Sequence, residues 1–387
     1  MHLLFVKTSL VWPRSSGHDV HTYEMMRALA KSGCKISLLT VDPPTEAALA
    51  DLDLTWQGTF DDVAEPTQPL VQLSWLENKY CSYWGVQHVH IAKVRAQCEA
   101  LGADVVVAVG LDILPYLAAV QEAQTVWYAA DEWVLHHWSQ IAISRPSSLA
   151  ELKPGLIKGV YERAFSSRVD RVWVVSHADR RATRFFMGAR NVDVIPNGVD
   201  ADHYSPHHGN DEVAHSCVFW GRLDFGPNVD ALRWFIGRVW PRIRSVSPSA
   251  KFSVFGFQPG PEVEQMAQAE GIELIPNLPD IRAEICRRQV VVLPFVSGAG
   301  IKNKLLEAAS MARPILASRT ALNGLQVEGE QPLQGAGSPA DWSNQLLQLW
   351  RDESLRRELG QRARSWVCHS HSWASCADMA LEGLKSC

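Results

Sequence analysis

Short apolar runs alternate with amphipathic segments along the whole chain, which predicts strands and helices in turn. In the first half, runs rich in Val, Ile and Leu predict strands at 3–7, 35–40, 105–109, 125–128, 171–175 and 192–195. Helices are predicted between them, at 18–31, 70–101 with a break, 111–122, 157–167 and 176–186. Ser176 and Asp179 have the spacing of a capping box, which favours a helix start there. Continuous apolar strands are typical of a parallel sheet that is covered on both faces.

The same alternation begins again in the second half. Strands are predicted at 216–220, 251–255, 272–274, 290–293 and 315–317, and helices at 228–246, 261–270, 281–288 and 302–311. Beyond Pro339 the pattern is wholly helical, and a polar stretch at 203–215 separates the two halves. Two such arrays predict an α/β protein with two doubly wound, Rossmann-like domains.

We therefore expect an N-terminal domain at 1–202, a linker at 203–215 and a C-terminal domain at 216–370. The last segment, 371–387, is expected to form a helix that packs back on the N-terminal domain. Ligands of doubly wound sheets bind at the carboxyl ends of the strands, so we expect the two domains to face each other across a binding cleft.

Composition narrows the class of protein. The 387 residues are 47% hydrophobic and 20% charged with a formal net charge of −5, so nothing indicates a nucleic-acid partner. The eight cysteines form no C-x-x-C pair and no zinc-type spacing, which fits a reducing cytosol and no structural metal. The chain has no apolar run long enough to span a membrane. Its 15 tryptophans are either core and interface residues, or part of an apolar acceptor surface or membrane-peripheral face.

The segment Pro294–Ala308 carries the clearest chemical signal. A strand ends at Pro294, a glycine-rich turn that includes Gly300 follows, and a helix is predicted from Lys302. An open backbone, a helix N-terminus and added cations together form an anion site.

Helical geometry places two side chains of this segment on one side. Lys304 and Glu307 lie about 60° apart around a helix, whereas Lys302 lies about 140° from Glu307. Lys304 could bind a phosphate while Glu307 accepts hydrogen bonds from ribose hydroxyls. The alternative is a surface Lys–Glu pair, worth a few tenths of a kcal/mol.

Two further positions are candidate phosphate contacts. Arg222 follows the first strand of the second domain, where a guanidinium can form bidentate bonds to phosphate, although such an arginine is more often a surface ion-pair partner. Gly17 follows the first strand of the first domain and precedes a helix, so it either admits an anion to the backbone or simply forms a turn. The chain has no G-x-G-x-x-G, which argues against a dinucleotide cofactor.

These residues carry a resemblance to family 4 of the retaining glycosyltransferases, which have the GT-B fold. The similar stretches are Val194–Asp200, Gly221–Asp230, Pro279–Asp280, Pro294–Ala308 with Arg313-Pro314, and a closing helical region that contains Trp373. The form of Gly298–Ala308 resembles the branch of bacterial transferases that act on exopolysaccharides or related glycans.

The chain departs from the family pattern in three places. The family usually carries two glutamates in the glycine-rich segment; Glu307 matches the second, but Ala299 occupies the place of the first, which in the family reaches the donor sugar. Many members have a lysine a few residues after the Gly-Arg pair, whereas Asp224–Asn228 contains none. The catalytic loop after the strand at 125–128 often holds a histidine in the family, and here it offers Asp131.

The resemblance implies a transferase that moves a sugar, with retention, from a nucleotide-diphosphate sugar to a glycan or lipid-linked acceptor. Arg222, Lys304 and the helix start at Gly300 would hold the diphosphate, Glu307 the ribose, and Asp131 would lie near the reacting hydroxyl. No metal or other cofactor is expected, and the expected place is the cytoplasm or the inner face of the membrane. Two alternatives stay open: a nucleotide-sugar 2-epimerase, and a non-catalytic glycan- or nucleotide-sugar-binding protein of the same fold.

Overall fold

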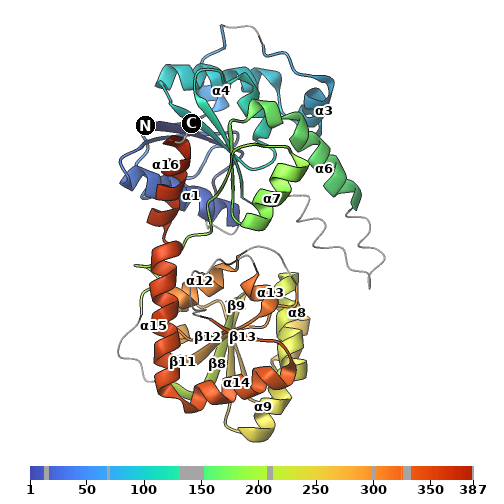
Figure 1. Ribbon diagram of the computed structural model, residues 1–387, viewed down its shortest axis with the longest axis vertical. Coiled ribbons are helices and arrows are strands. Elements are labelled where there is room, and N and C mark those ends of the chain that lie inside the picture. The colour runs from blue at the N-terminus through green and yellow to red at the C-terminus, as the bar shows by residue number, and fades with distance from the viewer. Residues whose placement is uncertain are drawn as a thin grey trace. The chain divides into compact units, whose positions relative to one another are not determined.

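The chain folds into two compact units (Figure 1). The computed structural model describes residues 1–12, 17–67, 70–130, 152–206, 212–297, 301–323, 325 and 333–385. Unit 1 comprises Met1–Asn197 and Trp373–Cys387, and unit 2 comprises Gly198–Ser372. The division at Asn197 lies ahead of the boundary at 202 that the sequence suggested. The difference arises because Val199 pairs with Ser372 and donates its amide hydrogen bond to the carbonyl of His371, so the chain is already part of unit 2 there.

Unit 1 is built on a parallel sheet of seven strands, in the order β3-β2-β1-β4-β5-β6-β7. The strands are β1 (His2–Lys7), β2 (Lys35–Thr40), β3 (Trp56–Thr59), β4 (Val105–Val109), β5 (Gln124–Ala130), β6 (Arg171–Val174) and β7 (Val192–Val194). Successive side chains enter opposite cores: Leu4 and Val6 pack on one face, and Leu3 and Phe5 on the other. The sheet is therefore covered on both faces, as its apolar strands predict.

Helices cover the two faces of this sheet. They are α1 (Gly17–Lys31), α2 (Glu46–Leu49), α3 (Trp75–Trp84), α4 (His88–Leu101), α6 (Leu152–Ala164), α7 (His177–Phe186) and α16 (Trp373–Lys385). The predicted break in 70–101 falls at Gly85, whose φ of +70° ends α3 in the left-handed conformation. The segment predicted as a helix at 111–122 is instead a short 3₁₀-helix, Leu114–Ala119. Ser176 caps α7 by accepting a hydrogen bond from the amide of Asp179.

Unit 2 has a parallel sheet of six strands, in the order β10-β9-β8-β11-β12-β13. The strands are β8 (Val213–Arg222), β9 (Lys251–Phe257), β10 (Ile272–Pro276), β11 (Arg288–Leu293), β12 (Ile315–Ser318) and β13 (Gln334–Ala336). The helices are α8 (Gly226–Trp234), α9 (Trp240–Val246), α10 (Pro261–Met266), α11 (Arg282–Cys286), α12 (Asn303–Ser310), α13 (Arg319–Leu322), α14 (Pro339–Arg351) and α15 (Glu353–Ser370). The helix predicted at 228–246 is interrupted by a π-helical turn at Phe235–Val239.

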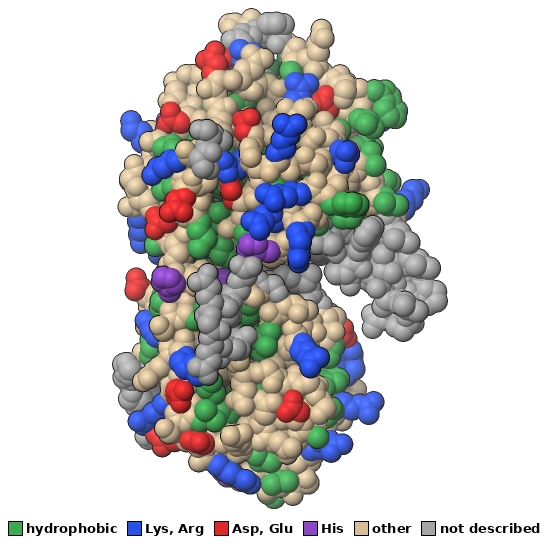
Figure 2. Space-filling model, in the orientation of Figure 1, with side chains coloured by type: hydrophobic (Ala, Val, Ile, Leu, Met, Phe, Trp, Pro, Cys, Tyr) green, Lys and Arg blue, Asp and Glu red, His purple; other side chains and the backbone are tan. Residues whose placement is uncertain are grey.

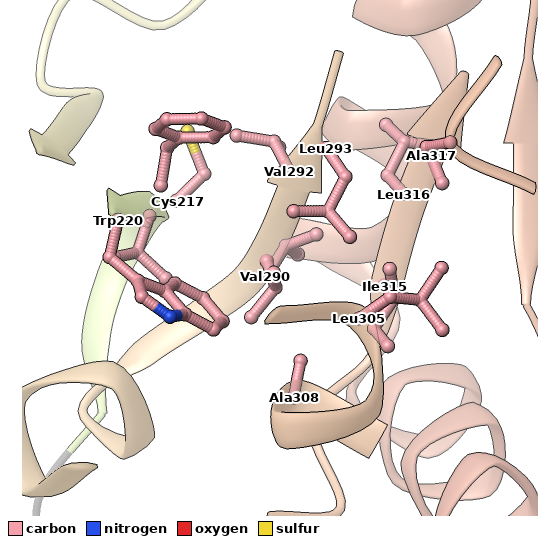
Figure 3. Close-up of a cluster of buried hydrophobic side chains, with 14 of the residues drawn as sticks. Cys217, Trp220, Val290, Val292, Leu293, Leu305, Ala308, Ile315, Leu316 and Ala317 are labelled. Carbon is pink, nitrogen blue, oxygen red and sulfur yellow. The ribbon is translucent and has the colours of Figure 1, made fainter. Parts of the chain in front are cut away.

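One core fills unit 2. Buried side chains of β8, β11 and β12 meet those of α12 in Figure 3, among them Val290, Leu305 and Ala308. This packing fixes α12 against the sheet, and with it every side chain that α12 carries.

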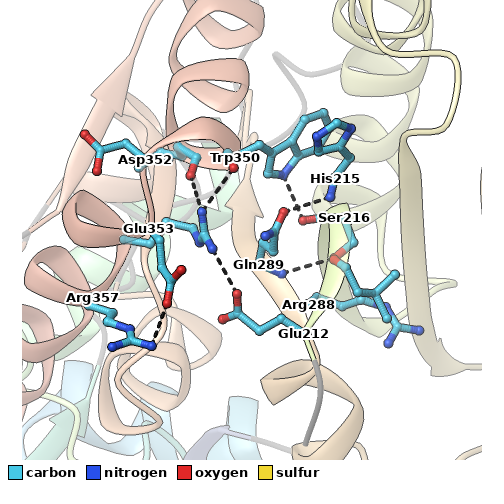
Figure 4. A network of polar contacts seen from close by, with 12 residues as sticks. Glu212, His215, Ser216, Arg288, Gln289, Trp350, Asp352, Glu353 and Arg357 are labelled. Carbon is cyan, nitrogen blue, oxygen red and sulfur yellow. Dashed lines mark hydrogen bonds and ion pairs between the residues drawn. The ribbon is translucent and has the colours of Figure 1, made fainter.

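A polar network closes the amino end of the unit 2 sheet (Figure 4). The indole of Trp350 donates to the carbonyl of Ser216 at 3.0 Å, and the amide of Gln289 donates to the Ser216 hydroxyl at 3.1 Å. Arg356 of α15 donates to Glu212 at 3.0 Å. These groups hydrogen-bond to one another and hold α14 and α15 against the sheet. A ligand site is therefore expected at the opposite, carboxyl end of the strands.

None of the described helices has both the length and the apolar character that crossing a membrane requires.

Candidate functional site

The carboxyl end of the unit 2 sheet brings the sequence-predicted residues Arg222, Lys304 and Glu307 into one region. β8 ends at Arg222 and leads into α8, and its neighbour β11 leads into α12, which carries Lys304 and Glu307. Because β8 and β11 are adjacent and parallel, the loops that follow them emerge side by side. This is the edge at which doubly wound sheets bind their ligands.

Lys304 extends from α12 towards the end of β8. Its Nζ donates to Asn228 Oδ1 at 2.8 Å and lies 4.9 Å from the ring centre of Phe219 and 5.1 Å from that of Phe295. The pKa of Lys304 is lowered to about 8, mainly by loss of water around the ammonium; Glu307 opposes this effect and the nearby charge of Lys302 adds to it. The site therefore holds an ammonium group with little water around it, where an anion would interact strongly.

Glycine is required at the point where Lys304 meets β8. Gly221 has a φ of +140°, and a Cβ there would lie 2.8 Å from Lys304 Nζ. On the paired strand β9, a Cβ at Gly256 would lie only 1.9 Å from the carbonyl oxygen of Gly221. The two glycines let the strands and the lysine approach closely, and sequence analysis did not single out Gly256.

Glu307 lies one helical turn beyond Lys304 and faces β8. Its Oε2 accepts a hydrogen bond from Trp220 Nε1 at 2.9 Å, and it also hydrogen-bonds to the hydroxyl of Tyr204. Burial raises the pKa of Glu307, while Trp220, Lys304 and Tyr204 partly offset the increase. Figure 3 shows Trp220 at the end of β8 beside the core of β11 and α12. Sequence analysis did not identify Trp220 or Tyr204, because both lie far before Glu307 in the chain.

Lys302 does not lie where helical geometry put it. α12 begins at Asn303, and Lys302 precedes it with extended backbone angles of φ −87° and ψ 110°. Its Nζ lies 5.4 Å from the ring centre of Phe295, the same ring that Lys304 contacts. The predicted angle of about 140° assumed that the helix already included Lys302. Both lysines therefore contribute positive charge to this region.

Arg222 has its guanidinium at the surface, with 54% of the side chain exposed. It forms a two-point ion pair with Asp224, at 3.1 Å from Nε and 2.7 Å from Nη2. Its link to Lys304 runs through Asn228, whose Nδ2 donates to the Arg222 carbonyl at 2.7 Å. The surface ion pair that the sequence offered as the ordinary role of this arginine is thus present in the structure.

Comparison with known families accounts for this arrangement. A model described as "Glycosyltransferase Family 4" matches residues 15–203, and a model described as "Glycosyl transferases group 1" matches residues 214–352. The chain belongs to the family 4 glycosyltransferases. It therefore is an enzyme that transfers a sugar from a nucleotide-diphosphate sugar, in a retaining family.

Solved structures share the GT-B fold of this glycosyltransferase at low sequence identity. TarM is 13% identical with a TM-score of 0.70, and all of this chain aligns with 99% of that one. Sucrose-phosphate synthase from Thermosynechococcus elongatus is 15% identical with a TM-score of 0.68, covering 100% and 98% of the two chains. HepE from Anabaena, solved in complex with UDP, is 14% identical with a TM-score of 0.67 and full coverage of both chains. None of the curated proteins compared with the chain matches it.

Asn228 is a further site residue that sequence analysis missed in this glycosyltransferase. It is 4% exposed in the first turn of α8, inside the stretch where many family members carry a lysine. Its amide oxygen accepts from Lys304 and its amide nitrogen donates to the Arg222 backbone. Asn228 thus holds the ammonium of Lys304, which α12 carries, next to β8.

Several predicted site positions are not described by the structure. Asp131, Ala299 and Gly300 lie outside the described residues. Gly17 is the first residue of α1, and the residues that join it to the first strand lie partly outside the described set. The roles suggested for these four positions stay predictions. Among the described residues, no group of three or more His, Cys, Asp or Glu side chains could hold a metal ion.

The carboxyl end of the unit 1 sheet holds a buried polar cluster around His21 of α1. Its Nδ1 is hydrogen-bonded to the Tyr128 hydroxyl at 2.5 Å and its Nε2 to Asn197 Oδ1 at 2.7 Å. The indole of Trp373 packs edge-on against the imidazole, with the ring centres 5.0 Å apart. These contacts join α1, β5 and α16.

Proposed function

We propose that the site at the carboxyl end of the unit 2 sheet binds the nucleotide diphosphate of the donor sugar. Lys304, Arg222 and the backbone around Gly300 hold the diphosphate, and Glu307 accepts hydrogen bonds from the ribose. The observation that carries the proposal is the position of Lys304: a half-buried ammonium with a pKa of about 8, held by Asn228 Oδ1 at 2.8 Å. A partly desolvated cation of this kind stabilises the charge that develops on a leaving diphosphate.

Arg222 can bind the diphosphate because Asp224 holds its guanidinium only weakly. The Arg222–Asp224 pair is exposed, and exposed ion pairs contribute little because water and salt screen them. A diphosphate offers two or more oxygens in the geometry that a guanidinium prefers. We expect the arginine to exchange Asp224 for the donor when the donor binds. With two protein cations present, the proposed reaction takes place without a divalent metal.

The acceptor belongs to unit 1 in this proposal. Gly17 and Asp131 belong to the acceptor side in this proposal, with Asp131 near the reacting hydroxyl. The acceptor is a glycan or a lipid-linked sugar, and the reaction serves polysaccharide synthesis of the exopolysaccharide type. It takes place in the cytoplasm, with peripheral contact to the inner face of the membrane.

Calorimetric titration tests the donor site. A panel of UDP, GDP, ADP and dTDP identifies the nucleotide, and the matching nucleoside is titrated beside it. Lys304→Ala should weaken the diphosphate by about tenfold to a hundredfold and leave the nucleoside unchanged, because a charge-assisted hydrogen bond contributes about 1.5–3 kcal/mol. Glu307→Gln should weaken both ligands. Lys251→Ala, at the exposed amino end of β9, is the matched control.

The outcome that contradicts the donor site is an equal and small effect of Lys304→Ala and Lys251→Ala on the diphosphate. Lys302 is unsuitable as a control because its ammonium shares the Phe295 ring with Lys304. Product formation from the donor alone, without any acceptor, would point to an epimerase instead.

A substitution at Asp131 tests the acceptor side. Asp131→Asn should lower turnover by about tenfold or more, since a group that positions or accepts a proton usually contributes at least that much. The melting temperature should barely change. Near-normal turnover would show that Asp131 only caps a helix, a role worth about 1 kcal/mol of stability.

A further inference from the structure

Three helices of unit 1 form one continuous layer over a face of its sheet. Tyr80 of α3, Phe165 just after α6 and Met187 just after α7 belong to the same core. The rings of Tyr83 in α3 and Tyr161 in α6 lie 5.9 Å apart, and Arg163 of α6 donates to the carbonyl of Phe186 at the end of α7. Figure 1 shows α3, α6 and α7 together on one side of the sheet. Their outer sides therefore form a single surface.

The outer side of α3 combines aromatic and basic side chains. Trp75, Lys79 and Tyr83 follow one another at intervals of four residues, so they share one side of the helix. Trp75 is 71% exposed and Tyr83 55% exposed. Lys79 Nζ lies 5.7 Å from the centre of the Trp75 ring.

α6 repeats this combination. Leu156 and Val160 are both more than half exposed and lie one turn apart. Lys153 and Arg163, three residues before and three residues after this pair, are exposed on the same side. The helix thus shows two aliphatic side chains between two cations.

α7 continues the pattern at its second half. Arg181, Arg184 and Phe185 are exposed within one turn of each other, and Phe185 is 76% exposed. We call the outer sides of these three helices the α3–α6–α7 surface.

The acidic side chains of the three helices are turned inward. Glu77 is buried and accepts hydrogen bonds from Arg168 and from the Ser74 amide. Glu162 is buried, and Asp179 is buried in the first turn of α7, where its amide is capped by Ser176. Figure 2 shows basic and hydrophobic side chains gathered over the part of unit 1 in which Figure 1 labels these helices. Since these are the three acids within α3, α6 and α7 as the structure describes them, the outer sides of the helices carry charges of one sign.

We propose that the α3–α6–α7 surface binds a lipid bilayer that carries anionic headgroups. Trp and Tyr favour the headgroup level of a bilayer, aliphatic and Phe side chains enter the acyl boundary, and Lys and Arg are attracted by anionic lipids. A protein partner would have to supply an acid opposite each of these cations, whereas an anionic bilayer presents negative charge over its whole surface. The inference rests on the proposed function in one respect: a lipid-linked acceptor would be reached from this surface.

Vesicle co-sedimentation of the full chain tests the surface. The protein should bind vesicles of phosphatidylcholine with phosphatidylglycerol, more weakly as salt is raised, and should not bind vesicles of phosphatidylcholine alone. Arg181→Gln with Arg184→Gln should lower the partition coefficient about 25-fold, since each basic side chain near an anionic surface contributes about fivefold. Trp75→Ser with Phe185→Ser should lower it as well. Val246→Ser and Arg357→Gln, both exposed in unit 2, are the matched controls.

Four results would overturn the proposal. They are absence of binding to either vesicle, equal binding to both, unchanged binding of the α3–α6–α7 variants, and a concentration-dependent dimer that the same variants abolish. Titration of the variants with nucleotide separates this inference from the donor site. The surface variants should keep their affinity for the diphosphate, and Lys304→Ala should keep its affinity for vesicles.

Discussion

Lys304 is the residue whose surroundings say most about the chemistry. Its ammonium contacts two aromatic rings and one amide oxygen, and its neighbour on the helix is a carboxylate that burial makes harder to ionise. None of these neighbours neutralises it as fully as an ordinary ion pair would. An anionic ligand would therefore supply the strongest partner that this ammonium lacks.

The lowered pKa of Lys304 predicts a pH dependence for donor binding. The free site holds a charged lysine below pH 8 and a largely neutral one above it, whereas an exposed lysine stays charged until about pH 10.4. The dissociation constant of the nucleoside diphosphate should therefore rise as pH passes through 8, approaching about tenfold per pH unit. Calorimetric titration between pH 7 and pH 9.5 measures it. Lys304→Met should give a flat profile, and an alkaline rise that persists in this variant would contradict the assignment.

At this scale the sequence predicted the residues that lie within one motif and missed those that meet it from elsewhere. Lys304 and Glu307 were found because three positions on a helix fix their relative direction. Asn228, Trp220 and Tyr204 were not found, because their contacts depend on how β8 and α8 pack against α12. Lys302 was misplaced because its position depends on the residue at which the helix begins.

At the scale of elements, the site consists of two helices that meet over the end of one strand. α12 carries Lys304, and α8 carries Asn228, whose amide oxygen accepts a hydrogen bond from the ammonium. Gly221 lies next to both side chains. In many family members a lysine stands in the loop or first turn that Asn228 occupies here. The distance of 2.8 Å between Lys304 Nζ and Asn228 Oδ1 means that either helix could deliver a cation to the same place.

A reciprocal exchange tests this equivalence. Lys304→Asn alone should weaken the diphosphate about tenfold to a hundredfold, as loss of a charge-assisted bond does. Adding Asn228→Lys to it should restore most of the affinity, because the ammonium returns to the same place from α8. Nucleotide titration of the single and double variants gives the comparison. A double variant as weak as Lys304→Asn would mean that the direction of approach matters, and that the two helices are not interchangeable.

The sequence correctly predicted the central strands, whose apolar runs are continuous because both faces are covered, and also the edge strands β7 and β10. Two short edge strands, β3 and β13, were missed. Trp56–Thr59 and Gln334–Ala336 are partly exposed and contain glycine, so neither has a clear apolar pattern. The helix predicted around Leu114–Ala119 was too long. The residues of this 3₁₀-helix are all buried and mostly apolar, a pattern that is also typical of a longer buried helix.

At the scale of the whole molecule, the chain leaves unit 1 and returns to it. α16 follows all of unit 2 in sequence, yet it packs on α1, and Trp373, Cys376 and Ala377 belong to the core of unit 1. The core of unit 1 is thus made from two distant parts of the chain.

Replacement of Trp373 should therefore weaken unit 1 and spare unit 2. Trp373→Ala removes a buried indole, which costs about 3–5 kcal/mol. Hydrogen exchange followed by mass spectrometry should show faster exchange in α1 and β5, with β11 and α12 unchanged and nucleotide affinity retained. Trp350→Ala, in the core of unit 2, is the matched control and should give the reverse pattern. Equal acceleration in both units after Trp373→Ala would show that they unfold together.

The return of α16 also has a consequence during synthesis on the ribosome. Unit 2 is one uninterrupted stretch, Gly198–Ser372, whereas unit 1 waits for a helix that is translated after that stretch. At roughly 5–20 residues per second, the delay is about 10–35 seconds. Through that interval α1 and β7 of the nascent first half lack the helix that packs on both of them. Unit 2, which is translated later, can therefore finish folding before unit 1. A chaperone that shields nascent chains would bind the incomplete unit 1.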